Sequence, residues 1–454
     1  MRSAPEQRSA RSPTRCAPYL VTTGRTHSET LDVTHGDVRR TSARADIPRD
    51  DDAASEPTNL TRDPASPRVR SFGTSVFTEM SRLANQYGAV NLGQGFPDFS
   101  GPSFAKEAAK AAIDADLNQY AESHGATRLR IAIARTWNDR YGTDVDPDRE
   151  ITVTSGATEA IFDAVQALVG PGDEIVVFEP FYDSYLPSAI MASASLRVVT
   201  LRPPDWSFDL EEAAAAFGPR TRLLLLNTPH NPTGKVFTRS ELVTLAELCQ
   251  RWDIVAVTDE VYERIVFDDA EHVPLATLPG MWERTLTISS TGKTFSMTGW
   301  KVGYAIGPGR LTAPLRAVHQ FVTFASATPF QEAMALALER APELGYYTDL
   351  SRDYHGRRDA LKGVLDGANL PTLPVGGAYF LMSNISHLGF ETDVEFCRWL
   401  TAEIGVAAIP PSAFYLDPAR APLLARFCFA KREETIQQAA ERLARVPQRA
   451  RSGI

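Results

Sequence analysis

The sequence has few cysteines, no long apolar run and no excess of positive charge. Only four of its 454 residues are cysteine, and no two of them form a C-x-x-C pair. A zinc ribbon or a thioredoxin-type site therefore has no support, and no metal ligand set is expected. No apolar run approaches the roughly 20 residues that span a bilayer, so we expect no membrane partner. The net charge of −9 disfavours nucleic acid as a partner, because affinity for phosphate backbones rests mainly on Lys and Arg.

The four cysteines are Cys16, Cys249, Cys397 and Cys428. Sparse and scattered cysteines are typical of a reducing compartment, so the sequence predicts a cytoplasmic protein. We interpret these side chains as small hydrophobic core residues rather than as ligands or disulfide partners.

The composition of the chain changes near residue 69. Residues 1–68 are rich in Arg and Asp and have few apolar residues beyond 19–21. Such a segment buries too little apolar surface to offset the entropy lost on ordering, so we predict a disordered extension. Its acidic residues argue against a transit peptide, and the absence of an apolar stretch argues against a secretory signal. Residues 447–454 are interpreted as a short tail.

The remaining chain alternates between apolar strand patterns and helical patterns. Helices are predicted at 104–113, 128–141 and 157–169, and short buried strands at 151–154, 174–178, 222–226, 254–258 and 285–289. This alternation predicts an α/β protein with a mostly parallel sheet between helices. After residue 329, amphipathic stretches at 331–341, 351–366, 393–404 and 433–445 predict a second, smaller α+β domain.

Polar residues follow several of these strands, where open α/β sheets bind ligands. Strand 151–154 leads through Gly156 into a helix, an arrangement in which backbone N–H groups can hold a phosphate, although most such turns bind nothing. Strand 222–226 leads into the proline-rich run NTPHNPTG. This loop either has only a structural role or holds one side chain, such as Asn231, in a fixed position.

Two charged residues follow the next two strands. Asp259 comes after strand 254–258, where it is either a helix N-cap or a carboxylate that faces a cationic ring nitrogen. Lys293 follows strand 285–289 among Gly, Phe, Met and Trp residues, with Lys301 eight positions further on. An apolar neighbourhood and a nearby cation both lower the pKa of a lysine and favour Schiff-base chemistry. The alternative is a solvated surface lysine.

Two nucleotide-binding patterns are incomplete. The Gly-Lys-Thr at 292–294 lacks the first P-loop glycine, because position 287 is Thr287. The pair Gly93 and Gly95 lacks the third glycine of a dinucleotide fingerprint, because position 98 is Asp98. These gaps argue against a nucleoside triphosphatase and against a nicotinamide dehydrogenase.

Six motifs, in order, resemble those of the class I/II aminotransferases, which are fold type I pyridoxal-phosphate enzymes. They are NLGQGFPDF (91–99), NQY (118–120), TSGATEA (154–160), NTPHNPTG with TDEVYE (227–234 and 258–263), SSTGKTFSMTGWKVG (289–303) and RFCF (426–429). The resemblance covers roughly residues 70–445. It implies a large cofactor-binding domain at 104–337 with a sheet of seven strands. It also implies a smaller domain formed by 69–103 and 338–446.

The resemblance also implies a role for individual residues. Lys293 would carry pyridoxal 5′-phosphate as a Schiff base and then act as the general base. Asp259 would pair with the pyridinium nitrogen, and Asn231 and Tyr262 would contact the ring oxygen. The residues implied at the phosphate are Gly156, Ala157, Ser290, Lys301 and, from a neighbouring subunit, Tyr120.

Three further residues are implied around the ring and the substrate. Tyr182 would stack on the cofactor ring, although an ordinary core aromatic explains it equally well. Arg426 would bind the α-carboxylate of the substrate, and Gly95 would allow the backbone to approach it. The implied partners are thus an amino acid, a 2-oxo acid and a second copy of the chain.

The motifs are most similar to those of kynurenine and glutamine transaminases and of bacterial methionine aminotransferases. Phe77 and Phe324 fall at positions that line the side-chain pocket in that branch. Both are apolar here, which favours a neutral, sulfur-containing or aromatic substrate. Two alternatives remain on the same fold: a cysteine-S-conjugate β-lyase and a succinyl-diaminopimelate aminotransferase. A cofactor-binding transcription regulator is disfavoured, because residues 1–68 show no DNA-binding helices.

Overall fold

The computed structural model describes residues 64–70 and 72–446. The predicted extension at 1–68 therefore lies almost entirely outside the described residues, and so do Cys16 and the predicted tail at 447–454.

A mixed sheet of seven strands forms the centre of the fold. Its strand order is β2-β8-β7-β6-β5-β3-β4. The five predicted strands are confirmed as β2 (Ile151–Ser155), β3 (Glu174–Glu179), β5 (Thr221–Asn227), β6 (Val255–Asp259) and β7 (Thr285–Ser290). The neighbouring pairs among β4, β3, β5, β6 and β7 are parallel, and β8 (Val302–Ile306) runs antiparallel to both β2 and β7. The predicted α/β class and mostly parallel sheet are confirmed.

Two strands of this sheet were not predicted from the sequence. Strand β4 (Ser195–Thr200) lies at the edge of the sheet and alternates between exposed and covered residues, so it has no continuous apolar run. Strand β8 contains Gly303 and follows Gly299, which in the sequence indicate a break. A residue with a Cβ would not fit at Gly303, because that atom would lie 2.3 Å from the backbone carbon of Gly156.

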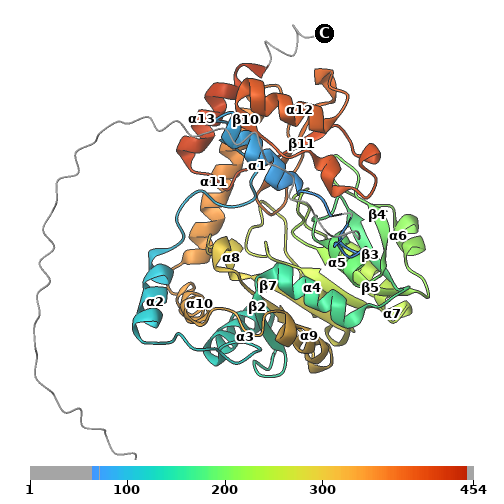
Figure 1. Ribbon diagram of the computed structural model, residues 1–454, viewed down its shortest axis with the longest axis vertical. Coiled ribbons are helices and arrows are strands. Elements are labelled where there is room, and N and C mark those ends of the chain that lie inside the picture. Colours follow the sequence, from blue (N-terminus) through green and yellow to red (C-terminus); the bar gives the residue numbers. More distant parts are fainter. Residues whose placement is uncertain (1–63, 71, 447–454) are drawn as a thin grey trace, which may run out of the picture. The chain divides into compact units, whose positions relative to one another are not determined.

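Helices cover both faces of the sheet, and the strands alternate their side chains between them. Leu223 and Leu225 pack with residues of α4 (Ala157–Leu168) and α9 (Gly309–Val322). Leu224 and Leu226 point to the opposite face and pack with residues of α7 (Arg239–Arg251). A strand buried on both faces reads as an unbroken apolar run, which is why β5 is recognisable in the sequence. Figure 1 shows α4 and α9 together, on one side of the sheet.

A second group of elements combines the beginning and the end of the described chain. Strand β1 (Val90–Asn91) pairs with β10 (Val406–Ala407), and β9 (Phe380–Asn384) pairs with β11 (Leu424–Cys428). One hydrophobic cluster joins residues of α1 (Val76–Gln86) and β1 to residues of the three C-terminal helices. These helices are α11 (Tyr346–Gly367), α12 (Asp393–Trp399) and α13 (Glu433–Leu443). A π-helical turn over Leu400–Ile404 continues α12.

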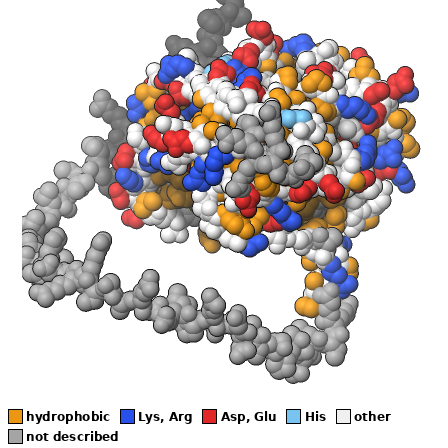
Figure 2. All heavy atoms as spheres, turned by 90° about the horizontal axis from the view of Figure 1, so that it is seen from above, with side chains coloured by type: hydrophobic (Ala, Val, Ile, Leu, Met, Phe, Trp, Pro, Cys, Tyr) orange, Lys and Arg blue, Asp and Glu red, His pale blue; other side chains and the backbone are white. Residues whose placement is uncertain are grey.

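Three further helices form a group beside the sheet. Helix α10 (Thr328–Arg340) packs against α2 (Ser103–Asp114) and α3 (Thr127–Tyr141). On the face in Figure 2, Lys and Arg side chains lie interspersed with Asp and Glu. Within the described residues, no helix is long and apolar enough to cross a membrane.

Candidate active site

A cavity of about 250 Å³ lies at the carboxyl ends of the central strands. Asn227, Asp259 and Ser290, the last residues of β5, β6 and β7, all line it. Phe380 and Arg426, from β9 and β11, line it as well. The cavity is therefore built both by the seven-stranded sheet and by the C-terminal strand pair.

Backbone and cationic groups form one end of the cavity. Gly156 has a φ of 84° and is the N-cap of α4, a backbone conformation that favours glycine. A Cβ at this position would lie 2.9 Å from Nζ of Lys301. The first N–H groups of α4 and the positive end of its dipole point out of the helix at this turn, so an anion is favoured there.

Asp259 is buried at the end of β6. Its Oδ2 accepts a hydrogen bond from Oη of Tyr185 at 2.7 Å. The Asn227 side chain fixes the neighbouring backbone, because it donates to the Asp259 carbonyl at 2.7 Å and accepts from Asn231 N at 2.7 Å. Burial raises the pKa of Asp259 to about 6. No ion pair to Asp259 is formed within the described residues, and a cation placed beside it would lower the pKa of this carboxyl.

Lys293 lies in the short helix α8 (Thr291–Thr294), directly after β7. Its Nζ donates a hydrogen bond to Oη of Tyr379 at 3.0 Å and lies 5.5 Å from the centre of the Tyr262 ring. Burial and the nearby charges of Lys301 and Arg426 lower the pKa of Lys293 to about 8, although Asp259 acts in the opposite direction. A substantial fraction of this amine is neutral near physiological pH.

Arg426 is fully buried on β11. Its Nη1 donates to Oδ1 of Asn231 at 2.8 Å, and its Nη2 donates to the Gly93 carbonyl at 3.0 Å. The guanidinium lies 4.1 Å from the centre of the Phe380 ring and about 5 Å from two other rings. Its Nε is buried and has no hydrogen-bond partner among the described residues. The residue lines the cavity, and its fixed positive charge suits a carboxylate there.

Most of the predicted site residues line this single cavity. They are Phe77, Gly95, Gly156, Ala157, Tyr182, Asn231, Asp259, Tyr262, Ser290, Lys293, Lys301 and Arg426. Tyr120 and Phe324 do not line it. Their rings contact each other edge to face at 5.2 Å, and the two residues are 82% and 41% exposed. The described chain therefore leaves this aromatic pair on its surface.

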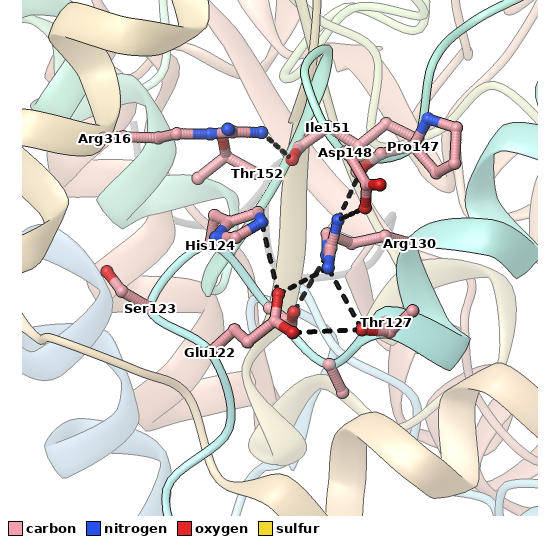
Figure 3. A network of polar contacts seen from close by, with 12 residues as sticks. Glu122, Ser123, His124, Thr127, Arg130, Pro147, Asp148, Ile151, Thr152 and Arg316 are labelled. Atoms are coloured by element: carbon pink, nitrogen blue, oxygen red, sulfur yellow. Dashed lines mark hydrogen bonds and ion pairs between the residues drawn. The ribbon is translucent and has the colours of Figure 1, made fainter.

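A network of ionic contacts holds the loop that carries Tyr120 (Figure 3). Arg130 is buried on α3 and pairs with Glu122 at 2.6 Å and with Asp148. Its Nε also donates to the Gly125 carbonyl at 2.9 Å. The loop between α2 and α3 is therefore fixed to the body of the protein, although Tyr120 itself extends into solvent.

Three residues that hydrogen-bond to predicted site residues were not assigned a role from the sequence. Asn227 lies in the NTPHNPTG run, and Tyr185 follows Tyr182 by three residues, so both lie in or near stretches that already pointed to the site. Tyr379 lies in none of the six motifs. Its contact with Lys293 joins residues 86 positions apart and becomes visible only in the fold.

A buried polar cluster lies on α4 and α9, close to the turn at Gly156, and consists of Glu159, Asp163 and His319. Nε2 of His319 faces the Ser123 carbonyl at 2.7 Å, so this nitrogen carries a proton, and Nδ1 lies 2.8 Å from Oε1 of Glu159. Both oxygens of Asp163 are buried without a hydrogen-bond partner among the described residues. Burial, followed by the charge of Glu159, raises the pKa of Asp163 to about 7.

Asp163 makes the stability of the protein depend on pH. Because its folded pKa lies above the unfolded value of 3.8, the folded state binds more protons between these values, and stability falls as pH rises through them. In the wild-type protein, this carboxyl should lower the free energy of unfolding by about 2 kcal/mol as the pH rises from about 5.5 to 7. We expect the Asp163→Asn variant not to show this loss. Urea unfolding at several pH values measures this pH dependence of the free energy of unfolding. The exposed Asp139→Asn on α3 is the control, and an unchanged slope for Asp163→Asn would contradict the assignment.

The residues around the cavity fit pyridoxal phosphate. The space left by the missing Cβ at Gly156, next to Lys301 and the start of α4, suits a phosphate. The buried carboxylate of Asp259 suits a cationic ring nitrogen, and the amine of Lys293, with its lowered pKa, suits an aldehyde. The fold and the site together define a pyridoxal-phosphate enzyme of fold type I.

Comparison with known proteins gives the family. The chain belongs to the family "Aminotransferase class I and II", whose model matches residues 87–443. The protein is thus a pyridoxal-phosphate-dependent transaminase that acts on amino acids and 2-oxo acids. The predicted family, activity and cofactor are confirmed.

Several relatives cover nearly the same length. The chain is 44% identical to the methionine aminotransferase of Escherichia coli over 386 residues, which is 85% of this chain and 99% of that protein. It is 45% identical to a probable N-succinyldiaminopimelate aminotransferase of Mycobacterium tuberculosis (84% and 98% covered). It is 40% identical to human kynurenine–oxoglutarate transaminase 1 (83% and 96% covered). A solved structure of an Escherichia coli protein with methionine aminotransferase function, 44% identical, matches 85% of this chain and 100% of that one with a TM-score of 0.81.

Proposed function

We propose that the protein transfers the amino group of a neutral, sulfur-containing or aromatic L-amino acid, such as methionine, glutamine or kynurenine, to a 2-oxo acid. One observation carries this proposal. The cationic residues that line the cavity from the described chain are Lys293, Lys301 and Arg426. Two of them are needed for the cofactor, so Arg426 alone is left for a substrate carboxylate.

The rest of the substrate space is aromatic. Phe77, Phe96 and Phe380 line the cavity, and Phe77 and Phe380 also flank the guanidinium of Arg426. A second carboxylate on the substrate would lose its hydration there without gaining a cation. A thioether, an amide or an aromatic ring would instead gain contact area and lose little.

Each binding residue has a distinct task in this proposal. Gly156, Ala157, Ser290 and Lys301 hold the phosphate through N–H, hydroxyl and ammonium donors. Asp259 holds the ring nitrogen in its protonated form, and Asn231 and Tyr262 hydrogen-bond the ring oxygen. Tyr182 lines the cavity and covers the ring, while Gly95 lets the backbone approach the substrate beside Arg426.

Lys293 moves the proton. When bound, pyridoxal phosphate supplies an electrophilic aldehyde and withdraws the electron pair of the broken Cα–H bond. Nζ of Lys293 takes the α-proton and holds it as an ammonium hydrogen. It then delivers this proton to the cofactor carbon that is bonded to the transferred nitrogen. A pKa of about 8 keeps this amine close to the pH at which both transfers are efficient.

We further propose a homodimer with shared sites. The exposed pair Tyr120 and Phe324, together with Phe321, which is 87% exposed, presents aromatic surface beside a firmly held loop. Covering this surface with a second copy would bury it, and Tyr120 would reach the phosphate bound in the partner subunit.

We also propose that the chain divides into a large part at 104–337 and a small part formed by 69–103 and 338–446. The buried thiols Cys249, Cys397 and Cys428 support a cytoplasmic location.

Half-reactions with single amino acids test the substrate proposal. The holoenzyme is mixed with L-methionine, L-glutamine, L-kynurenine, L-aspartate or N-succinyl-diaminopimelate, and loss of the visible cofactor band is followed. We expect kcat/KM for the best neutral substrate to exceed that for L-aspartate by about 100-fold. Preference for L-aspartate or the succinylated diacid would overturn the proposal. Release of pyruvate from a cysteine S-conjugate without an acceptor would identify the β-lyase instead.

Subunit mixing tests the shared site. We expect Lys293→Ala and Tyr120→Ala each to be inactive or impaired alone. A mixed dimer would contain one site with an intact Lys293 and an intact Tyr120 from the other subunit. We expect co-unfolding and refolding of the two variants to restore part of the activity. No recovery in a sample that sediments as a mixed dimer would contradict a shared site.

A further inference from the structure

Tyr379 does not line the cavity, but its hydroxyl contacts two residues that do, Lys293 and Gly95. Its Oη accepts a hydrogen bond from Nζ of Lys293 at 3.0 Å and donates one to the Gly95 carbonyl at 2.6 Å. The residue is fully buried and directly precedes β9. One hydroxyl thus connects three distant parts of the chain, and none of the roles given above accounts for it.

The partners fix the direction of both hydrogen bonds. A backbone carbonyl can only accept, so the hydroxyl hydrogen of Tyr379 points to Gly95. The lone pairs of Oη then remain for an N–H of Lys293. The Tyr262 hydroxyl is a further hydrogen-bonding neighbour of this oxygen. Burial raises the pKa of Tyr379 well above its ordinary value and lowers that of Lys293 to about 8. The phenol therefore keeps its proton over the range in which the amine loses one.

The surrounding rings hold the hydroxyl in place. The Tyr379 ring lies edge to face with Tyr262 at 4.9 Å and with Phe380 at 4.8 Å. On its other side, the Tyr354 ring lies nearly parallel at 6.1 Å. A phenol confined in this way presents Oη at one position rather than over a range of rotamers.

We propose that Tyr379 is a positioning residue for proton transfer by Lys293. The inference rests on the proposed role of Lys293 as the base. With one N–H of the neutral amine held by Oη, the free lone pair of Nζ is directed away from Tyr379. In the transfer step the Cα–H bond breaks, its electron pair stays with the substrate and is drawn into the cofactor, and a new N–H bond forms on Nζ. The Tyr379 hydroxyl keeps its own proton throughout and continues to donate it in the hydrogen bond to the Gly95 carbonyl.

The same hydroxyl links proton transfer to substrate binding. Gly95 lines the cavity, and Gly93, two residues earlier, accepts from Arg426. A substrate that contacts the backbone at 93–95 also fixes the position of the Gly95 carbonyl, which accepts the Tyr379 proton. The position of this carbonyl in turn orients Oη of Tyr379 toward Lys293. A substrate carboxylate at Arg426 thereby orients the base.

The Tyr379→Phe variant tests the proposal, because it removes only the hydroxyl and keeps the ring. We expect the rate constant of the half-reaction with the best amino acid to fall by about 10- to 100-fold, and the isotope effect with the α-deuterated substrate to rise. Binding of an unreactive carboxylic acid analogue and of the cofactor should change by less than about threefold. Tyr354→Phe is the matched control, because its hydroxyl makes no hydrogen bond to Lys293 or Gly95 in the described chain.

A second readout does not require turnover. In the cofactor-free protein, acetylation of Lys293 by acetic anhydride is followed against pH by peptide mass spectrometry. An accepted N–H···O bond stabilises the ammonium form, so the apparent pKa of Lys293 should fall in Tyr379→Phe and stay unchanged in Tyr354→Phe. Replacement of Tyr379 by 3-fluorotyrosine, which retains ring and hydroxyl but is a weaker acceptor, should give a smaller loss of rate than Phe.

The outcomes separate the possible failures. A weaker affinity for the analogue with an unchanged proton-transfer rate would show that Tyr379 only supports the 93–95 backbone, and would overturn the proposal. Full activity of the 3-fluorotyrosine protein together with an unchanged Lys293 pKa in Tyr379→Phe would overturn it as well. If wild-type protein shows no half-reaction, or Lys293→Ala transaminates normally, the function proposed for Lys293 fails instead.

Discussion

The Lys293→Ala variant is expected to lose at least about 10⁴-fold in kcat. The substitution removes the amine that we propose both attaches the cofactor and moves the α-proton. Arg426 and the phosphate-binding groups remain, so the variant should still bind an amino acid together with pyridoxal phosphate. Steady-state kinetics and the visible absorption spectrum measure the two effects separately.

A second lysine provides the control for this experiment. Lys362 lies half-exposed on α11 and pairs with Asp366. Lys362→Ala should keep full activity and the visible band of the bound cofactor. Comparable activity in Lys293→Ala and wild type would refute the assignment of the catalytic lysine.

The Asp259→Asn variant is expected to lower kcat by about 10²- to 10³-fold. Asparagine has almost the same shape and still accepts from Tyr185, but it lacks the charge that we propose holds the ring nitrogen protonated. Electron withdrawal from the Cα–H bond then becomes weaker, while the phosphate contacts are unchanged. We therefore expect a large loss of rate with little loss of cofactor affinity.

Tyr185→Phe is the companion variant for Asp259. Its hydroxyl lowers the pKa of Asp259 and so opposes the effect of burial. Without it the carboxyl pKa should rise further, and the acidic limb of the pH–rate profile should move to higher pH with a smaller loss at its maximum. An identical profile for wild type and Tyr185→Phe would contradict the assigned contact.

The central strands and the residues at their ends could be predicted from the sequence, because burial on both faces leaves an unbroken apolar run. The sequence also placed Asn231, Asp259 and Lys293 at the correct edge of the sheet. Edge strand β4 and the glycine-containing β8 give no such run. The contact of Tyr379 with Lys293 depends on how the C-terminal strand pair packs against the cavity, and no local pattern encodes that packing.

The positions of Tyr120 and Phe324 show a different limit. Tyr120 was expected at the phosphate of a neighbouring subunit and Phe324 in the side-chain pocket, and in one chain both lie on the surface, away from the cavity. A motif indicates that a residue belongs to a site. It does not give the position of that side chain in the folded chain.

The aromatic rings around Arg426 have a consequence for the ionic strength of the medium. Dissolved ions screen charges that water surrounds, whereas this guanidinium is fully covered by protein and flanked by three rings. Its attraction for a substrate carboxylate is therefore hardly reduced by added salt once the substrate is bound. The rate constant for dissociation of the bound amino acid should therefore stay nearly the same from dilute buffer to concentrated salt.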